Sequence, residues 1–164
     1  MVGWIDIFTR QSYRDVVVDS FNFCRTNKQL KIHAWVIMSN HLHCILSSDI
    51  GRLSDTIGEL KGFTSGTMLR MIETGTESRK EWMLHQFKYY ANRHTRNDKY
   101  QLWTHENHAE ELLPMVPEKG LIKLNYIHQN PVRAGMVAEP EHYLYSSAID
   151  YAGRKGLIEV DLMR

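Results

Sequence analysis

Residues 32–46 read IHAWVIMSNHLHCIL, and this stretch decides the expected fold. Its first part, Ile32 to Met38, is apolar and rich in β-branched side chains, which is typical of a buried strand. Ser39 and Asn40 predict a turn, and a second apolar run follows to about Leu46. Two strands with so short a connection predict an antiparallel hairpin.

Two histidines, His41 and His43, stand at the start of the second strand. Side chains two residues apart in a strand point to the same face. The two imidazoles could therefore hold one metal ion from one side, while Leu42 and Cys44 turn toward a core on the other. Taken alone, such a pair on a strand more often belongs to the core or arises by chance than binds a metal.

The composition is that of an ordinary globular protein. For 164 residues, of which 43% are hydrophobic and 24% charged, we expect a single domain spanning residues 1–164. A formal net charge of +1 argues against a strongly basic nucleic-acid coat, but it leaves room for a local basic groove. Cys24 and Cys44 form no CxxC pair and are expected to be reduced core residues. No apolar run is long enough for a membrane span and no secretory signal is visible, so the expected location is the cytoplasm.

The rest of the chain mixes helical and strand patterns. Helical spacing predicts helices over residues 12–27, 53–72, 77–94 and 118–129, with Ser12 capping the first and Trp82 on the buried side of the third. Alternating or β-branched runs predict short strands over residues 2–8, 100–103 and 157–160. Pro131 disfavours helical geometry at Asn130, so the fourth helix is expected to end there. The pattern as a whole predicts an α+β fold.

The fourth predicted helix carries a second group of polar residues. At about 100° per residue, Leu121, Leu124 and Ile127 define its apolar side. Tyr126 and Asn130 lie one turn apart on the roughly opposite side and could meet the two histidines across a cleft. Imidazole and amide oxygen would suit Mg²⁺ or Mn²⁺. A tyrosine beside such a site is a possible nucleophile for a phosphodiester, although its free pKa of about 10 means that it needs assistance.

A plainer interpretation of the same helix is that Tyr126 covers the core and Asn130 ends the helix before the proline. The motifs around these residues favour the chemical interpretation. His41-Leu42-His43 resembles the motif of the HUH endonuclease superfamily, and residues 125–135, NYIHQNPVRAG, resemble the tyrosine segment of its single-tyrosine transposases. With residues 143–148, YLYSSA, the chain most resembles the REP-associated tyrosine transposases, and the resemblance extends over nearly the whole chain.

The resemblance implies a ferredoxin-like central antiparallel sheet flanked by helices. It also implies a metal-dependent enzyme that cleaves and rejoins single-stranded DNA near hairpins through a 5′-phosphotyrosine intermediate. Tyr126 would be the nucleophile, and His41, His43 and Asn130 would bind Mg²⁺ or Mn²⁺. Family members often have Gln where this chain has Asn130, and they commonly have more residues before the first strand. A homodimer is possible on this resemblance, and DNA would draw the protein to the nucleoid.

Two other functions stay open at this point. One is a catalytically silent protein, derived from such a transposase, that binds single-stranded or hairpin DNA; the presence of Tyr126, His41 and His43 argues against it. The other is an unrelated metal hydrolase, which the lack of an HExxH motif or a carboxylate cluster disfavours. Lys61, Arg93, Arg96 and Arg133 are the candidate phosphate contacts.

Overall fold

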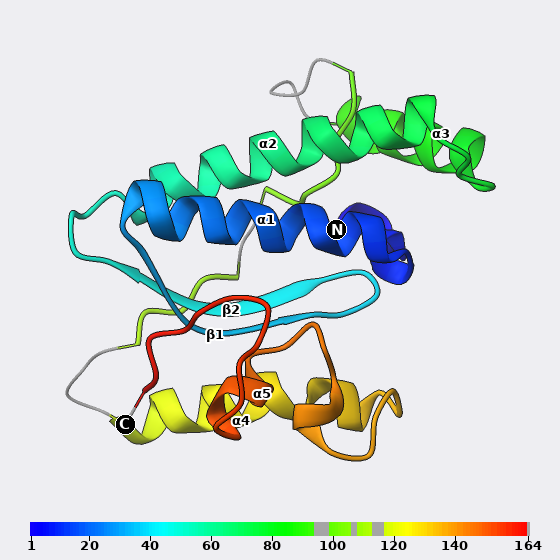
Figure 1. Cartoon of the computed structure of the whole chain (residues 1–164). Helices are drawn as coiled ribbons and strands as arrows, with labels where there is room; N and C mark the ends of the chain where they lie inside the picture. Colours follow the sequence, from blue (N-terminus) through cyan, green and yellow to red (C-terminus); the bar gives the residue numbers. More distant parts are fainter. Residues whose placement is uncertain (94–98, 106–107, 113–116, 164) are drawn as a thin grey trace.

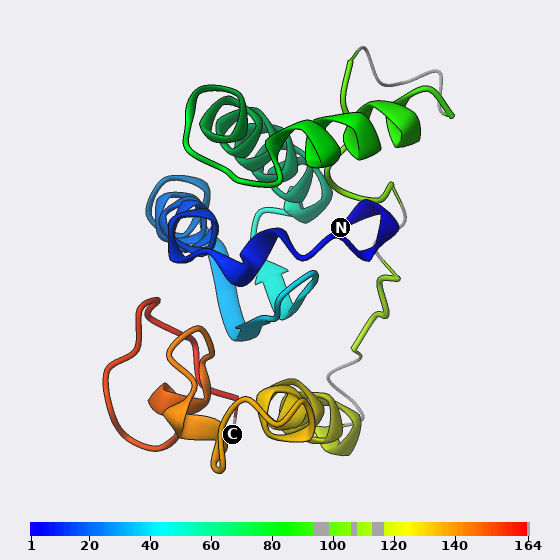
Figure 2. The same cartoon turned by 90° about the vertical axis from the view of Figure 1, so that its right-hand side faces the viewer.

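The computed structural model describes residues 1–93, 99–105, 108–112 and 117–163. A β-hairpin lies in the middle of the molecule, with helices from the first part of the chain on one side and the C-terminal part of the chain on the other (Figure 1). Figure 2 shows the same three layers from a second direction. The helices and strands are α1 (Gln11–Lys28), β1 (Leu30–Ile37), β2 (Leu42–Ser48), α2 (Leu53–Thr74), α3 (Lys80–Ala91), α4 (Pro117–Arg133) and α5 (Ala148–Tyr151), with 3-10 turns η1 (Val2–Trp4), η2 (Ile7–Thr9) and η3 (Pro140–His142).

The hairpin is antiparallel, as the sequence predicted. Its register pairs Leu30 with Ser48 at one end and Ile37 with Leu42 at the other. A bulge lies between Ile32 and Ala34, and a bulge shifts the alternation of side chains between the two faces. The α+β class and the central antiparallel sheet flanked by helices are confirmed, and the sheet has two strands within the described residues.

The hairpin separates two apolar cores, and β1 contributes to both. On the side of α1 and α2, Ile32, Trp35 and Ile37 belong to the larger core. On the other face, Ala34, Val36 and Met38 pack with two residues of α4, Leu124 and Ile127. Because β1 is covered on both faces, it holds the α4 layer in a fixed place relative to the hairpin turn.

Residues 143–147, in the C-terminal part of the chain, connect the α4 layer to β1 through hydrogen bonds. The Ile37 amide donates to the Tyr145 carbonyl, and the Ser147 amide donates to the Trp35 carbonyl, at 3.0 and 2.9 Å. Tyr143 Oη donates to the Ile37 carbonyl at 2.8 Å. The motif of residues 143–148 therefore has a structural role: it binds the end of β1 that leads to the histidines.

Three predicted strands are wrong. Residues 2–8 form η1 and η2, because Gly3 and Trp4 both have φ near +55°, which is incompatible with a strand. The predicted alternation is correct, since Ile5 and Ile7 are buried while Trp4 is exposed. Residues 100–103 and 157–160 also form no strand; the Leu102 carbonyl accepts instead from the Val2 amide at 2.8 Å.

All four predicted helices are present, with different ends. α1 begins at Gln11 and has no side-chain cap, so the cap predicted at Ser12 is wrong. α4 passes through Pro131 to Arg133, because a proline in the last turn removes a single backbone donor. The Ala134 amide bonds to the Asn130 carbonyl at 3.0 Å, and Gly135, with φ of +69°, follows the helix.

The third helix is shorter than predicted, because Glu77 is buried before it. Its carboxylate accepts the Arg79 backbone N–H at 3.1 Å and pairs with Arg10 Nε at 2.7 Å. α3 therefore begins at Lys80. Trp82, predicted on the buried side, is exposed, and His94 lies outside the described residues.

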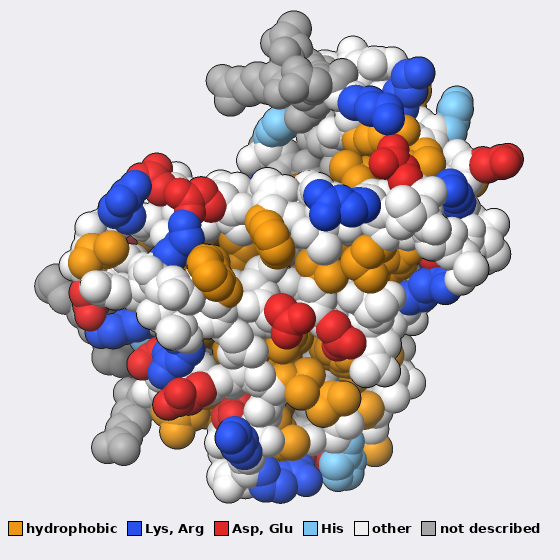
Figure 3. Space-filling view, turned by 45° about the horizontal axis from the view of Figure 1, so that its top comes forward, with side chains coloured by type: hydrophobic (Ala, Val, Ile, Leu, Met, Phe, Trp, Pro, Cys, Tyr) orange, Lys and Arg blue, Asp and Glu red, His pale blue; other side chains and the backbone are white. Residues whose placement is uncertain are grey.

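The cysteines differ from the prediction in one case. Cys24 is buried, as expected, but Cys44 is exposed, because the neighbouring part of β2 is only partly covered. None of the helices in the described part of the chain is both long and apolar enough to cross a bilayer. Figure 3 shows basic and acidic side chains interspersed on the face that it presents, in keeping with the balanced charge.

Candidate active site

The two histidines lie together at the turn end of the hairpin. His43 pairs with Val36 across the strands, and His41 comes directly before β2. Their ring centroids are 4.8 Å apart and their planes meet at 77°. Both side chains are half-buried. The prediction that they share one face is confirmed.

Both histidines are held in the neutral form, which a metal ligand requires. Burial and then the charge of His43 lower the pKa of His41 to about 4. Burial and then the charge of Lys123 lower the pKa of His43 below its usual value. At neutral pH the lone pairs of both rings are therefore available for a ligand.

Asn40 sets the orientation of the His41 ring. Its amide nitrogen donates to the Trp4 carbonyl at 3.3 Å, so its oxygen is the atom that faces Nδ1 of His41, at 2.7 Å. An amide oxygen only accepts, so Nδ1 of His41 carries the hydrogen. The lone pair then lies on Nε2, the arrangement that second-shell partners give to metal-binding histidines.

Tyr126 reaches the histidines from α4. Leu124 and Ile127 are anchored against β1, which turns Tyr126 toward the hairpin turn. The ring centroids of Tyr126 and His43 are 5.5 Å apart. Tyr126 is 41% exposed, so it borders the histidine pair and remains open to solvent. Residues far apart in the sequence thus form one cluster.

Asn130 is joined to this cluster through the backbone of Tyr126. Its amide nitrogen donates to the Tyr126 carbonyl at 2.8 Å, so its oxygen is the atom that it can offer to a metal. In the part of the chain that the structure describes, no group of three His, Cys, Asp or Glu side chains is placed to hold a metal. The structure brings the two imidazoles together as possible ligands, whereas the Asn130 side chain is held against its own helix, so its role as a third ligand stays a prediction.

Two basic side chains flank Tyr126. The Arg133 guanidinium lies 5.4 Å from the centroid of the tyrosine ring. Lys123, one turn before Tyr126, acts electrostatically on His43 and pairs with Glu110 at 2.6 Å. Arg133 was among the basic residues expected from the sequence. Lys123 was not, although its place three residues before Tyr126 puts it on the same side of a helix.

The other basic candidates have partners outside the cluster of Tyr126 and the histidines, although the charge of Lys61 acts on the N-terminal amine, which donates to the Asn40 carbonyl at 3.1 Å. Lys61 Nζ donates to the Thr104 carbonyl at 2.6 Å. Arg93 donates to the hydroxyl of Tyr89 at 3.2 Å. Arg96 lies outside the described residues. Asn40 was also missed as a functional residue, although it directly precedes the first histidine.

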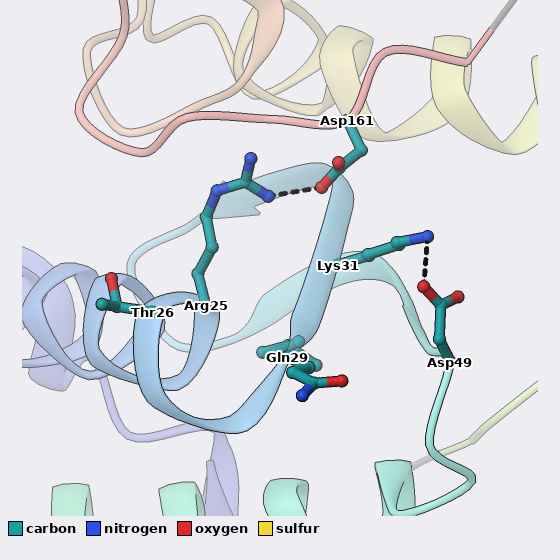
Figure 4. A pocket seen from close by; sticks show the side chains of 7 residues that line it. Arg25, Thr26, Gln29, Lys31, Asp49 and Asp161 are labelled. Carbon is teal, nitrogen blue, oxygen red and sulfur yellow. Dashed lines mark hydrogen bonds and ion pairs between the residues drawn. The ribbon is translucent and has the colours of Figure 1, made fainter.

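A polar hollow lies at the other end of the hairpin, away from the histidines (Figure 4). Its walls include Arg25, Lys31, Asp49 and Asp161. Arg25 pairs with Asp161, and Lys31 pairs with Asp49 at 2.6 Å. Because these cations and carboxylates neutralise each other, this hollow lacks the unbalanced charge of an anion or cation site.

The fold and the site define a class: an α+β protein in which two histidines on a hairpin face a tyrosine on a helix. The family model described as "Transposase IS200 like" matches residues 5–113, which is more than half of the chain. The protein therefore belongs to the IS200-like transposase family. The matched stretch contains both histidines and ends before Tyr126.

A solved structure of a REP-associated tyrosine transposase bound to a REP hairpin matches 96% of this chain and 76% of its own, with 18% identity and a TM-score of 0.46. No match was found among curated proteins. The match of the family model confirms the transposase family recognised from the motifs, and the REP-associated branch stays a prediction.

Proposed function

We propose that this transposase-family protein cleaves and rejoins single-stranded DNA at sites associated with hairpins, with Tyr126 as the nucleophile. The observation that carries the proposal is the approach of the Tyr126 and His43 rings to 5.5 Å, from segments that lie far apart in the sequence. A tyrosine that only covered the core would have no need of a pair of neutral histidines beside it. The proposed substrate also follows the solved relative, which was bound to a REP hairpin.

His41, His43 and Asn130 would hold a divalent ion, Mg²⁺ or Mn²⁺. Such an ion, when bound, polarises the scissile phosphate and offsets the charge that develops on it. The chain's own contribution is preparation of the ligands. Burial keeps the two imidazoles neutral, and Asn40 fixes the tautomer of His41.

In the proposed step, the phenolic oxygen of Tyr126 attacks the phosphorus. The new O–P bond forms as the bond from phosphorus to the 3′-oxygen breaks, which leaves a free 3′-hydroxyl and a 5′-phosphotyrosine. The phenolic proton leaves to solvent, to which Tyr126 is open, and the departing 3′-oxygen takes up a proton from solvent. A 3′-hydroxyl from the same or another end then attacks the phosphotyrosine and reverses the step, so no external energy source is needed.

Arg133 and Lys123 would act on the phosphate. Each lies near Tyr126 or His43, and each carries a positive charge at neutral pH. Two cations near the nucleophile favour a phosphate at the point of attack and offset the charge of the transition state. Glu110, which pairs with Lys123, would release it to the DNA.

Covalent capture tests this proposal. The protein is incubated with Mn²⁺ or Mg²⁺ and a hairpin oligonucleotide with single-stranded flanks, then run on a denaturing gel. The wild-type protein should form a DNA adduct, and Tyr126→Phe, which lacks the nucleophilic oxygen, should form none while it still binds DNA. Tyr89→Phe is the matched control, because Tyr89 is also exposed but lies on α3.

Two outcomes would contradict the proposal. An adduct that persists in Tyr126→Phe would reject Tyr126 as the nucleophile. Tight binding by the wild-type protein with no adduct in either metal would instead identify a catalytically silent DNA-binding protein.

A further inference from the structure

Trp4 is the largest exposed apolar side chain beside the candidate active site. It is 70% exposed. Its ring centroid lies 5.9 Å from that of His41, with the planes at 82°. Rings of Trp4, His41, His43 and Tyr126 thus follow one another in contact, and we refer to these four residues as the ring row. Trp4 forms one end of the row.

The backbone of Trp4 is fixed despite the exposure of its side chain. Asn40, the residue that orients His41, also donates to the Trp4 carbonyl at 3.3 Å. On either side, the Val2 amide bonds to the Leu102 carbonyl at 2.8 Å and Ile5 is buried. The segment therefore presents the indole from a rigid support.

The conformation of this segment is unusual for its residues. Trp4 has φ of +55°, a region that side chains other than glycine rarely occupy. Gly3 before it approaches Tyr90 so closely that a Cβ atom would lie 2.6 Å from the tyrosine ring. Unfavourable backbone conformations that persist because neighbouring contacts impose them gather at functional sites. Here the imposed conformation directs a tryptophan to the side of His41 and away from the core.

We propose that Trp4 is the stacking platform for an unpaired base next to the phosphodiester that Tyr126 attacks. The inference rests on the proposed function and names the residue that positions the strand in that site. A single strand that brings its phosphate to Tyr126 passes along the ring row, so its neighbouring base arrives within reach of the indole. Stacking on an aromatic side chain accepts any base and requires no net charge. It therefore suits a protein with a formal charge of only +1.

The test measures binding separately from cleavage. All proteins carry Tyr126→Phe, and affinity for a hairpin with single-stranded flanks is measured by fluorescence anisotropy. One nucleotide of the flank at a time is replaced by an abasic residue. We expect Trp4→Ala to weaken binding by about 5- to 140-fold, the range that base–aromatic stacking gives. One abasic position should weaken binding to a similar extent.

The decisive result is the combination of the two changes. If the missing base is the one that stacks on Trp4, the abasic oligonucleotide should bind Trp4→Ala no more weakly than it binds the protein with Trp4 intact. Trp4→Phe should recover part of the affinity. Trp82→Ala is the matched control, because Trp82 is exposed on α3, and it should bind like the parent protein.

A second measurement needs no substitution of Trp4. With 2-aminopurine at the position found in the abasic series, binding should quench the fluorescence of this base. If the losses of affinity from Trp4→Ala and from the abasic residue multiply at every flank position, or if 2-aminopurine is not quenched, Trp4 does not stack on a base. The exposed indole would then contact something else, such as a protein partner. A lack of covalent adduct, by contrast, would reject the proposed cleavage and leave the stacking result intact.

Discussion

Replacing Glu77 by alanine should lower the free energy of unfolding by about 3 kcal/mol, because its carboxylate is a buried junction of charged and polar groups. The side chain is 1% exposed and joins the start of α1 to the turn before α3. It accepts from the Arg79 amide at 3.1 Å and from the Tyr13 hydroxyl at 3.4 Å, and it pairs with Arg10 at 2.7 Å.

The magnitude follows from what each partner loses. The amide of Arg79 loses a hydrogen bond to a charged acceptor, worth about 1.5–3 kcal/mol. Tyr13 is buried, so a hydroxyl left without its acceptor costs about 1–3 kcal/mol. The guanidinium groups of Arg10 and Arg79 are partly exposed and regain water, so their ion pairs add at most about 1 kcal/mol. Because such terms are not additive, the expected total is about 3 kcal/mol.

Urea denaturation followed by circular dichroism measures this loss, and the melting temperature should fall by about 6–12 °C for a protein of this size. Glu81→Ala, at an exposed site on α3, is the control and should change stability by less than about 0.5 kcal/mol. A Glu77→Ala protein within about 1 kcal/mol of wild type would refute the assignment of Glu77 as a buried junction.

The pH dependence of the same site has a definite sign. Burial raises the pKa of Glu77, but the Arg79 amide and the charges of Arg10 and Arg79 outweigh burial and hold the pKa below its usual value of 4.5. The ionised carboxylate therefore stabilises the folded state above pH 4.5, and this contribution is lost as the pH falls through the lowered pKa. The stability difference between wild type and Glu77→Gln should shrink over that range. Parallel pH profiles for the two proteins would contradict this.

Three predictions concern the site itself. His41→Ala and His43→Ala should each abolish the covalent adduct and the Mn²⁺ binding that calorimetry measures, with little loss of stability because both side chains are only half-buried. Unfolding of either variant, together with no Mn²⁺ binding by the wild-type protein, would mean that the histidines serve only the core. Mn²⁺ affinity should persist below pH 6.5, because the pKa of His41 is lowered to about 4 and that of His43 is also lowered; a loss of affinity centred near pH 6.5 would contradict this. With Lys123 and Arg133 as the two phosphate contacts beside Tyr126, log K for DNA binding should fall against log salt with a slope of about −1.4, since each contact to a single strand contributes about −0.7. Anisotropy should also show tighter binding to hairpins with single-stranded flanks than to blunt duplex, and the reverse order would favour a general DNA-binding module.

The hairpin and its histidines could be predicted from sequence because they depend on local patterns. An apolar run, a two-residue turn and a spacing of two fix which side chains share a face, whatever the rest of the chain does. The approach of Tyr126 could be placed only through a resemblance. Helical spacing puts Leu124 and Ile127 on the apolar side, but it does not say which strand they pack against.

The errors arose where long-range contacts override local preference. Residues 2–8 alternate like a strand, yet the contact between Gly3 and Tyr90 imposes a turn. Glu77 has a good propensity for a helix, but its contacts with Arg10 and Tyr13 at the start of α1 hold it in the turn before α3. Pro131 could end a helix, and it is tolerated because the chain is already in its last turn. No window of sequence contains the partners that decide these cases.

The unequal size of the two cores has a consequence for motion. Among the described residues, five buried side chains form the core between β1 and α4, and the other face of the hairpin belongs to a much larger core. Opening costs less free energy where fewer apolar contacts must separate, so α4 is expected to form its own cooperative unit. Amide hydrogens of α4 should exchange with deuterium sooner than those of α1, under conditions where the whole molecule stays folded. Such openings would carry Tyr126 away from His43 and bring it back, and the free energy of this small interface would set how often they occur.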